Sequence, residues 1–404
     1  MKPRDYYKKI WIDFNAEKPL ILVSGPRQAG KTTFVEDIAS DEPVSLVFNY
    51  DIPENKVRII ETPTFFQEVD RIKGTTPLIV LDEIHKYSEW KNYLKGIYDG
   101  FSKEFRFLVT GSGRLDLSQK RGDSLAGRFL HFHLYPFTIG EIFSSAIGLT
   151  NSGILVEIPG RNQEAQDAWE TMFHVSGFPE PFIKGTKIKY RRWAKSYHSQ
   201  VIRNDIRDEF AVRQIDKMET LYHLLSTCVG SPFSASKNAA LLKVSHKTVS
   251  AWISVFERFF LIFKIRPYSE RIKRSLAKEP KLYFYDYCRI ADEAFRFENM
   301  VAVELRRALT LWNDFGLGEF ELWYLRNKEK EEVDFLVTDH GIPLFMVEAK
   351  LSRTELSASL LKFQITFNVP AIQLVNKPSI ARKIKNGSNE ILVVSAATWL
   401  AGLN

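Results

Sequence analysis

Residues Gly25-Pro-Arg-Gln-Ala-Gly-Lys-Thr-Thr33 follow directly after the apolar run Pro19-Leu-Ile-Leu-Val23. They have the spacing G-x-x-x-x-G-K-[ST] of a phosphate-binding loop between a strand and a helix. Glycine at both ends lets successive backbone N–H groups curl around phosphate oxygens, and the helix that follows adds its positive N-terminus. The stretch therefore predicts a site for a nucleoside triphosphate.

The loop residues have separate expected roles. Lys31 is expected to reach the outer phosphates, and Thr32 is expected to offer its hydroxyl to the magnesium ion that bridges them. The whole loop is predicted to contact the nucleotide, through Gly25, Pro26, Arg27, Gln28, Ala29, Gly30, Lys31, Thr32 and Thr33.

The composition limits the class of protein. A chain of 404 residues is longer than one ordinary core requires, so we expect two to four domains. No apolar run reaches the length of a membrane span, and we expect no membrane partner. The two cysteines, Cys228 and Cys288, and the lack of an apolar signal segment behind the N-terminus predict a cytoplasmic protein. The net charge of +7 suits a polyanionic partner or simple solubility, so the location of the charges decides.

The first third of the chain alternates short apolar strands with helix-like stretches, which predicts a parallel sheet covered on both faces. We expect strands at 21–24, 45–49, 78–82, 107–111 and 130–134. The third of these, within Pro77-Leu-Ile-Val-Leu-Asp-Glu83, ends in two acids. Asp82 is expected to hold the magnesium ion, and Glu83 to orient the water that attacks the γ-phosphate.

Two further positions are candidates for catalysis. The strand after the acidic one ends near Ser112, which is expected to sense the γ-phosphate, with Thr110 as the alternative. Arg128 is expected to neutralise transition-state charge on the nucleotide of a neighbouring subunit. Arg114 and Arg121 are alternatives for this role, and a surface salt bridge is the competing interpretation of Arg128.

Residues 218–286 read as helix, short helix, turn, longer helix and β-hairpin, which is the plan of a winged helix. The turn and the recognition helix begin in Lys243-Val-Ser-His-Lys-Thr-Val-Ser250, with Ser245 as the N-cap. Apolar residues recur at helical spacing and are expected to face the core, which leaves His246, Lys247 and Ser250 outward, toward a DNA groove. The inward residues are Val249, Trp252, Ile253, Phe256 and Phe260.

The hairpin, from Lys264 to Lys281, concentrates positive charge. It carries seven basic residues against two acids, Glu270 and Glu279. Because phosphate contacts dominate affinity for DNA, we expect the hairpin to grip the DNA backbone. The predicted DNA-binding residues are His246, Lys247, Arg271, Lys273 and Arg274. A winged helix used only for protein contact is the competing interpretation.

Two strands near the C-terminus carry Asp334 and the pair Glu348 and Lys350. Alternation puts Glu348 and Lys350 on one face of their strand. Carboxylates with a lysine suit magnesium-dependent cleavage of phosphodiesters, and the pattern resembles a PD-(D/E)XK nuclease core. Glu298 is the expected helix acid, with Glu304 as the weaker candidate. A solvated hairpin and a passive DNA clamp are the competing interpretations.

Several motifs together resemble one family, the AAA-type ATPases of bacteria and archaea whose C-terminal half is a domain of unknown function with a restriction-endonuclease-like core. The resemblance implies ATP and Mg²⁺ as cofactors and a nucleotide site made of Lys31, Asp82, Glu83 and Ser112. Gly113-Arg114 replaces the serines that often follow in the family, so the sensor residue stays open. The matching motifs are Gly25 to Thr33, Phe48-Asn-Tyr-Asp51, Leu81-Asp-Glu-Ile-His-Lys86, Thr110-Gly-Ser112, Ser124-Leu-Ala-Gly-Arg128, Leu134-Tyr-Pro-Phe137, Gly177-Phe-Pro-Glu180, Phe297-Glu-Asn299 and Val333-Asp-Phe335.

The predicted fold is therefore α/β, with three domains. Residues 1–160 are expected to form an AAA-type P-loop ATPase, 161–290 a helical lid with the winged helix, and 291–404 the nuclease-like domain. We expect ATP turnover to gate how the other two parts engage DNA. The alternative is an ATP-dependent scaffold or regulator for DNA or protein, with a catalytically silent C-terminal domain. We expect a homo-oligomer such as an AAA-type ring, with a dimer and a monomer as alternatives.

Overall fold

The protein is described by a computed structural model that covers residues 4–111, 125, 127–143, 162–210, 214–269, 278–387 and 389–403. It divides into two compact units, Met1–Pro136 and Phe137–Asn404. The predicted division into three domains stays a prediction.

The N-terminal unit alternates helices and strands as far as β4 and adds a last strand, β5. Its elements are α1 (Asp5–Glu17), β1 (Leu20–Ser24), α2 (Lys31–Asp41), β2 (Ser45–Asn49), α3 (Pro53–Glu61), η1 (Phe65–Glu68), β3 (Leu78–Asp82), η2 (Ile84–Lys86), α4 (Trp90–Phe101), β4 (Arg106–Gly111) and β5 (Leu130–His133).

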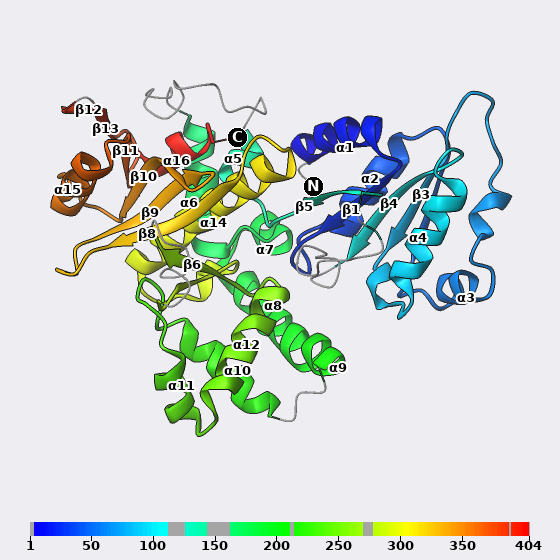
Figure 1. Cartoon of the computed structure of the whole chain (residues 1–404), viewed down its shortest axis with the longest axis horizontal. Coiled ribbons are helices and arrows are strands. Elements are labelled where there is room, and N and C mark those ends of the chain that lie inside the picture. Colours follow the sequence, from blue (N-terminus) through cyan, green and yellow to red (C-terminus); the bar gives the residue numbers. More distant parts are fainter. Residues whose placement is uncertain are drawn as a thin grey trace. The chain divides into compact units, whose positions relative to one another are not determined.

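The five strands form one parallel sheet in the order β2-β3-β4-β1-β5 (Figure 1). This confirms the predicted parallel sheet. β2 and β3 have the predicted bounds, β1 and β4 begin one residue earlier, and β5 ends one residue earlier. Because the strands are parallel, the phosphate-binding loop and the acids of β3 lie at the same carboxyl edge.

Aromatic side chains cover both faces of this sheet. On one face, the ring of Phe66 in η1 lies 5.1 Å from that of Phe105 and 5.5 Å from that of Phe107, centroid to centroid. On the other face, Phe132 of β5 stacks on Tyr7 of α1 at 6.1 Å. With both faces covered, β1 and β3 are buried at every residue, which explains their continuous apolar sequence.

The C-terminal unit begins with helices. They are α5 (Ile139–Phe143), α6 (Gln163–Val175), α7 (Pro179–Lys184), α8 (Lys187–Ser199), η4 (Gln200–Ile206), α9 (Arg207–Phe210), α10 (Ile215–Leu225), α11 (Ala235–Leu242) and α12 (His246–Arg258).

An eight-stranded mixed sheet follows, in the order β12-β13-β11-β10-β9-β8-β6-β7. The long helix α14 contacts β7, β8 and β10, and α15 contacts β9 and β10. The elements of this region are β6 (Ile262–Pro267), β7 (Lys281–Phe284), η5 (Tyr287–Arg289), α14 (Glu293–Asp314), β8 (Phe320–Arg326), β9 (Glu332–Asp339), β10 (Ile342–Lys350), α15 (Ala358–Phe367), β11 (Ala371–Val375), β12 (Ala381–Asn386), β13 (Asn389–Ser395) and α16 (Ala396–Leu400).

The hairpin of β6 and β7 is part of this sheet. β6 pairs antiparallel with β7 and parallel with β8, where Arg266 is in register with Trp323. The strands predicted as a wing are thus continuous with the strands predicted to carry the nuclease-like residues.

The aromatic layer gives a first prediction. Phe66 is fully buried, so Phe66→Ala is expected to lower the free energy of unfolding of the N-terminal unit by about 3–5 kcal/mol. Ile72→Ala removes an apolar side chain that is 54% exposed and is expected to cost less than about 0.5 kcal/mol. Urea denaturation of the full chain measures both, and equal losses would contradict the assigned core.

Candidate functional site

The loop from Gly25 to Gly30 joins β1 to α2 and depends on glycine at two positions. A Cβ atom on Gly25 would lie 2.0 Å from the carbonyl oxygen of Leu134, so any side chain there would clash with the backbone. Gly30 precedes α2 with φ of 92°, a left-handed conformation that glycine adopts without strain. The backbone can therefore take the curled path that phosphate binding requires.

Lys31 is the first residue of α2 and turns back into this loop. Its Nζ atom donates hydrogen bonds to the carbonyl oxygens of Gly25 at 3.1 Å and Pro26 at 2.8 Å. Burial lowers the pKa of Lys31, and the nearby carboxylates of Glu83 and Asp82 oppose that effect. The predicted phosphate-binding lysine thus lies within the loop, at the edge that carries the two acids.

Asp82, the last residue of β3, joins four elements. Its Oδ2 atom accepts hydrogen bonds from Thr32 Oγ1 and from Asn49 Nδ2, both at 2.8 Å, and its Oδ1 atom accepts one from Thr110 Oγ1. Burial raises the pKa of Asp82, while the hydrogen bonds from Thr110 and Thr32 lower it. Thr32 and Asp82 thus bring two oxygen ligands of the kind magnesium prefers beside the phosphate-binding loop.

Glu83 follows in an uncommon backbone conformation, with φ of 56°. Its Oε2 atom lies 3.5 Å from Lys86 Nζ and 3.7 Å from His85 Nε2. Its N–H group donates to Thr110 Oγ1 at 3.4 Å. These contacts orient the side chain predicted to act on the attacking water.

Two contributors to this site were missed at the level of sequence. Asn49 is in register with Asp82 on the neighbouring strand, and its place at the end of a predicted strand was a usable signal. Arg4 is buried, and its guanidinium donates to the carbonyl oxygen of Ala29 in the loop and to that of Tyr135 at 2.9 Å. It precedes the first helix, and no motif announces it.

The other predicted catalytic positions have different outcomes. Ser112, Arg114 and Arg121 lie outside the described residues. Arg128 forms an ion pair with Asp99, with 2.8 Å between Nε and Oδ1. It precedes β5, which enters the sheet beside the start of β1, so Arg128 lies toward the amino edge of the strands, away from the loop of its own unit. A role on a neighbouring subunit stays a proposal.

In the C-terminal unit, three of the predicted nuclease residues meet between β9 and β10. Asp334 Oδ2 accepts a hydrogen bond from the N–H of Ala349 at 2.8 Å, and Glu348 Oε1 lies 2.5 Å from Lys350 Nζ. Burial and the charges of Glu348 and Glu298 raise the pKa of Asp334 well above its ordinary range. The fourth predicted residue, Glu298 of α14, is therefore electrostatically part of the same cluster.

Lys281 is the unexpected member of this cluster. The hairpin pattern counted it among the basic residues of a DNA-binding wing, and that count was wrong for Lys281, because the residue is 0% exposed. Its Nζ atom lies 2.5 Å from Glu332 Oε1 and 3.3 Å from Glu298 Oε1. Burial works to lower the pKa of Lys281, but the charges of Glu298, Asp334 and Glu332 raise it overall. A buried ammonium group needs such partners.

Neither a metal-binding cluster nor a membrane-spanning helix is present among the described residues. Within the described residues, no group of three or more His, Cys, Asp and Glu side chains is arranged to hold a metal ion. None of the helices described combines the length and the apolar character needed to cross a bilayer.

The predicted recognition helix is α12. Ser245 caps it, accepting a hydrogen bond from the N–H of Thr248 at 3.0 Å, as predicted. His246 and Lys247 are exposed, in agreement with the helical spacing. Arg271, Lys273 and Arg274 lie outside the described residues.

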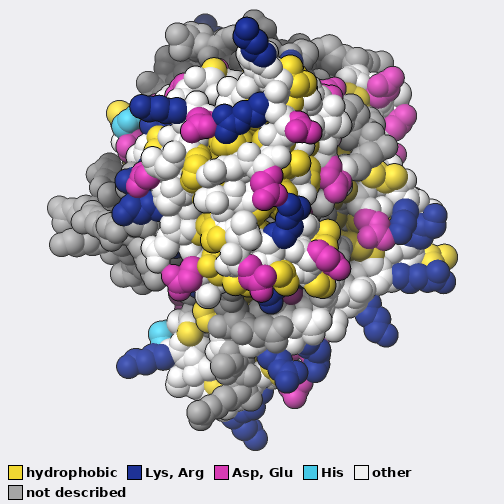
Figure 2. All heavy atoms as spheres, turned by 90° about the vertical axis from the view of Figure 1, so that its right-hand side faces the viewer, with side chains coloured by type: hydrophobic (Ala, Val, Ile, Leu, Met, Phe, Trp, Pro, Cys, Tyr) yellow, Lys and Arg dark blue, Asp and Glu magenta, His cyan; other side chains and the backbone are white. Residues whose placement is uncertain are grey.

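Charges are mixed on the surface seen from the right-hand side of Figure 1. Over its described part, Lys and Arg side chains are interspersed with Asp and Glu (Figure 2). Exposed ion pairs of the N-terminal unit include Arg71 with Glu104, at 2.8 Å. This mixture holds for the upper and central parts of the view, whereas Lys and Arg predominate in its lower part (Figure 2).

Comparisons with known proteins agree with the N-terminal site. Residues 17–143 match the family model described as an AAA domain, and residues 166–288 and 295–391 match two domains of unknown function, DUF8612 and DUF4143. Together with the parallel sheet and the phosphate-binding loop, the first match supports an AAA-type P-loop ATPase domain in the N-terminal unit. The nuclease-like nature of the C-terminal region is not part of these matches.

The relatives found are uncharacterised. One, from Mycobacterium tuberculosis, is 22% identical over 88% of this chain and 76% of its own length. Another, from Methanocaldococcus jannaschii, is 25% identical over 67% of this chain and 61% of its own length.

Solved structures with some likeness include a Walker-type ATPase of Pyrococcus abyssi, at 12% identity and a TM-score of 0.45, covering 73% of this chain and 95% of that one. AMPPCP-bound DnaA from Aquifex aeolicus has 12% identity and a TM-score of 0.31, covering 62% of this chain and 85% of that one.

Glu304, the weaker nuclease candidate, has a structural contact elsewhere. Its Oε1 atom accepts a hydrogen bond from the N–H of Ile139 at 2.8 Å, at the start of α5. Burial raises its pKa to about 7, although Arg307 and the N–H groups of Ile139 and Gly140 lower it.

This shift predicts a pH dependence. Between the ordinary pKa of 4.5 and the raised value of about 7, the folded chain binds more protons than the unfolded chain. The free energy of unfolding therefore falls as the pH rises through this window, by at most roughly 3 kcal/mol from Glu304. Glu304→Gln is expected to flatten the decline, and Glu329→Gln, at an exposed position, to leave it unchanged. Urea denaturation between pH 4.5 and 7 tests this, and the wild-type slope in Glu304→Gln would refute it.

Proposed function

We propose that the chain binds and hydrolyses ATP in its N-terminal unit and uses the cycle to control how its C-terminal unit engages DNA. The observation that carries this proposal is the meeting of Lys31, Thr32 and Asp82 at one edge of a parallel sheet, beside a glycine-dependent loop. The match of residues 17–143 to an AAA domain supports it.

The roles of the residues follow from their places. Lys31 exchanges its loop carbonyl partners for phosphate oxygens when the nucleotide binds. Thr32 and Asp82 hold the magnesium ion, which supplies charge neutralisation at the phosphates. Glu83 orients and polarises the attacking water, and Lys86 and His85 hold its carboxylate in place. Arg4 keeps the loop in position through Ala29.

Two further catalytic roles belong to this proposal. Ser112 is the sensor of the γ-phosphate, and Thr110, the alternative for this role, donates a hydrogen bond to Asp82. Arg128 acts on the nucleotide of a neighbouring subunit, for which it must leave Asp99. This role requires a homo-oligomer.

The DNA-binding part is α12 with the β6–β7 hairpin, as a winged helix. Its support is the order of α10, α11, α12 and the hairpin, the capped start of α12, and the exposed His246 and Lys247. Arg271, Lys273 and Arg274 grip the phosphates in this proposal. In this proposal, the nuclease-like cluster of Glu298, Asp334, Glu348 and Lys350 acts as a metal-dependent phosphodiesterase. Because no described group of three such side chains is arranged to hold a metal ion, its carboxylates would first have to rearrange around one.

A second candidate function is a scaffold or regulator with a silent C-terminal domain. The observation that favours it is the buried Lys281, whose ammonium group contacts Glu298 and Glu332 beside Asp334. Lys281 and Lys350 then neutralise part of the negative charge of the carboxylates without a metal ion. Incubation with Mn²⁺ or Mg²⁺ and DNA, beside Asp334→Ala, distinguishes the two, since identical traces exclude cleavage at this cluster.

The ATP site gives a direct prediction. Lys31→Ala is expected to abolish nucleotide binding, and Glu83→Gln to bind ATP normally but turn it over about 10²–10³-fold more slowly. Binding of a fluorescent ATP analogue and release of phosphate measure the two effects. Glu89→Gln, an exposed change nearby, is expected to behave like the wild type. Wild-type hydrolysis by either site variant would contradict these roles.

The link to DNA gives another. Duplex, single-stranded or branched DNA is expected to stimulate ATP turnover, and changing Arg271, Lys273 and Arg274 together to Ala is expected to remove the stimulation and reduce the salt dependence of DNA affinity. The matched control changes three exposed lysines elsewhere, Lys328, Lys330 and Lys377, to Ala. If both triple variants lose DNA stimulation and DNA affinity equally, the effect depends only on the net charge of the chain. That result would refute the hairpin as the phosphate-binding part.

A further inference from the structure

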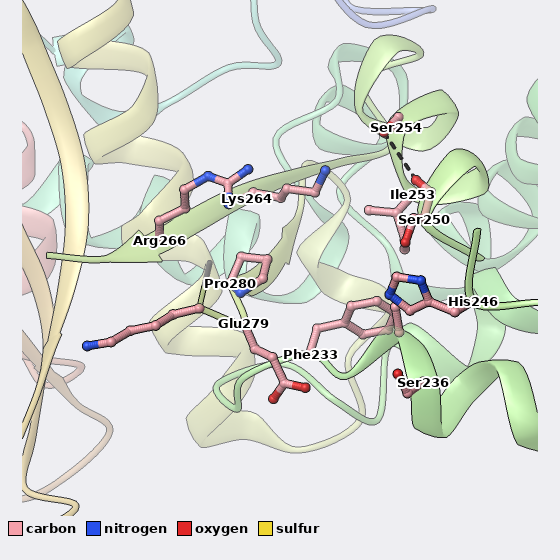
Figure 3. Close-up of a pocket in the computed structure, with 12 residues that line it drawn as sticks. Phe233, Ser236, His246, Ser250, Ile253, Ser254, Lys264, Arg266, Glu279 and Pro280 are labelled. Carbon is pink, nitrogen blue, oxygen red and sulfur yellow. Dashed lines mark hydrogen bonds between the residues drawn. The ribbon is translucent and has the colours of Figure 1, made fainter. Parts of the chain in front are cut away.

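A cavity of about 310 Å³ lies between α12 and the base of the β6–β7 hairpin (Figure 3). Phe233, Ile253 and Pro280 are apolar residues of its lining. The N–H of Phe233 donates to the carbonyl oxygen of Pro280 at 2.8 Å, which ties the segment before α11 to the start of β7. The cavity is thus bounded by α12, by the segment before α11 and by the start of β7, and this hydrogen bond joins the last two.

One side of the cavity is cationic. Lys264 and Arg266 of β6 extend along it next to each other, and Lys278 also lines the cavity (Figure 3). Lys264 forms an ion pair with Glu257, outside the lining, so part of its charge is already balanced. Three of the charged residues that line the cavity are cations and one, Glu279, is an anion, so positive side chains outnumber negative ones around this space.

The remaining lining can form hydrogen bonds. His246 and Ser250 of α12 and Ser236 of α11 point polar atoms toward the space in Figure 3. Ser254 donates to the carbonyl oxygen of Ser250 at 3.1 Å, so its hydroxyl is engaged within the helix. The Glu279 carboxylate lies on the side away from the Lys264 and Arg266 head groups (Figure 3).

These features form a site with two ends, an anion-binding end at Lys264 and Arg266 and a hydrogen-bond acceptor at Glu279, with Phe233 between them. A nucleotide has the matching chemistry, because it joins a phosphate to a flat base that carries amino donors and stacks on aromatic rings. The volume falls at the lower end of the range of small-ligand sites, which suits one nucleotide and excludes a base pair.

We propose that this cavity binds a single unpaired nucleotide, with its phosphate at Arg266 and Lys264 and its base toward Phe233 and Glu279. The source is either an unpaired position of a DNA strand or a free mononucleotide. The inference rests on the proposed DNA-binding role of α12 and the hairpin and makes it specific, since it predicts a preference for single-stranded or frayed DNA over closed duplex.

The test uses the full chain carrying Lys31→Ala, so that the phosphate-binding loop does not bind the probes. Ser250→Phe fills the cavity, and Arg266→Gln removes its cation. Ala251→Phe adds the same bulk at an exposed position of α12 that does not line the cavity. Fluorescence anisotropy measures binding of a labelled single-stranded oligonucleotide and of a duplex of the same sequence closed by hairpin loops at both ends.

Both cavity variants are expected to bind the single strand about tenfold more weakly, while Ala251→Phe binds it like the parent chain. Both cavity variants are expected to weaken binding of the closed duplex much less than binding of the single strand, whereas Lys247→Ala weakens binding of the duplex. Thermal unfolding checks that the Ser250→Phe variant folds. If that variant does not fold, the single-strand affinity of Arg266→Gln alone tests the inference. Unchanged single-strand affinity in both cavity variants would overturn the inference, and a duplex affinity that still depends on Lys247 would leave the proposed DNA-binding role intact.

Free dAMP separates the two sources of the nucleotide. If dAMP displaces the labelled single strand from the parent chain and Arg266→Gln abolishes this competition, the ligand is a mononucleotide. If the single strand binds but dAMP does not compete with it, the ligand is an unpaired position of DNA. Displacement of the strand by polyglutamate as effectively as by dAMP would overturn the inference, because the cavity would then select charge alone. If neither DNA form binds the parent chain or the wild-type chain supplied with ATP, the proposed DNA-binding role fails, and binding of dAMP to the parent chain alone tests the cavity.

Discussion

The buried carboxylate of Asp82 is the contact on which the nucleotide edge of the N-terminal unit depends. It ends β3 and accepts hydrogen bonds from Thr32 of α2, Asn49 of β2 and Thr110 of β4. A carboxylate out of water is costly unless donors surround it, so each of these residues is needed for the others to stay in place. The parallel sheet brings the donors together, and the carboxylate in turn aligns α2, and with it Lys31, on the phosphate-binding loop.

A buried charge has a comparable role in the C-terminal unit. Lys281 of β7 contacts Glu298 of α14 and Glu332 of β9, so the hairpin, the long helix and the central strands share one electrostatic cluster. The continuous sheet from β7 through β6 and β8 to β9 adds backbone hydrogen bonds to this link. In the proposed function, a force on the hairpin from bound DNA would therefore act directly on the carboxylates of the nuclease-like cluster. The same link explains why the C-terminal sheet does not divide at the end of the hairpin.

The sequence predicted the N-terminal fold closely because the signals there are local. A loop that needs glycine, apolar strands of five residues and acids at a strand end each follow from neighbouring residues, and the structure has the expected strands within one residue. The helical spacing of α12 and its Ser245 cap were also predictable for this reason. Arg4 was not, because its partners Ala29 and Tyr135 are 25 and 131 residues away along the chain.

The sequence by itself determined the chemistry of the phosphate-binding loop, the acids opposite it, and the pairing of Glu348 with Lys350 on one face of a strand. Only the tertiary structure decided what surrounds these groups. Lys281 looked like a surface cation in a basic hairpin, and the fold buries it among acids. Glu304 was the weaker candidate for the helix acid of that cluster, and in the fold its carboxylate contacts the start of α5 instead. The physical reason is that alternation and helical periodicity fix the face on which a side chain lies, whereas burial and charge partners depend on which distant element covers that face.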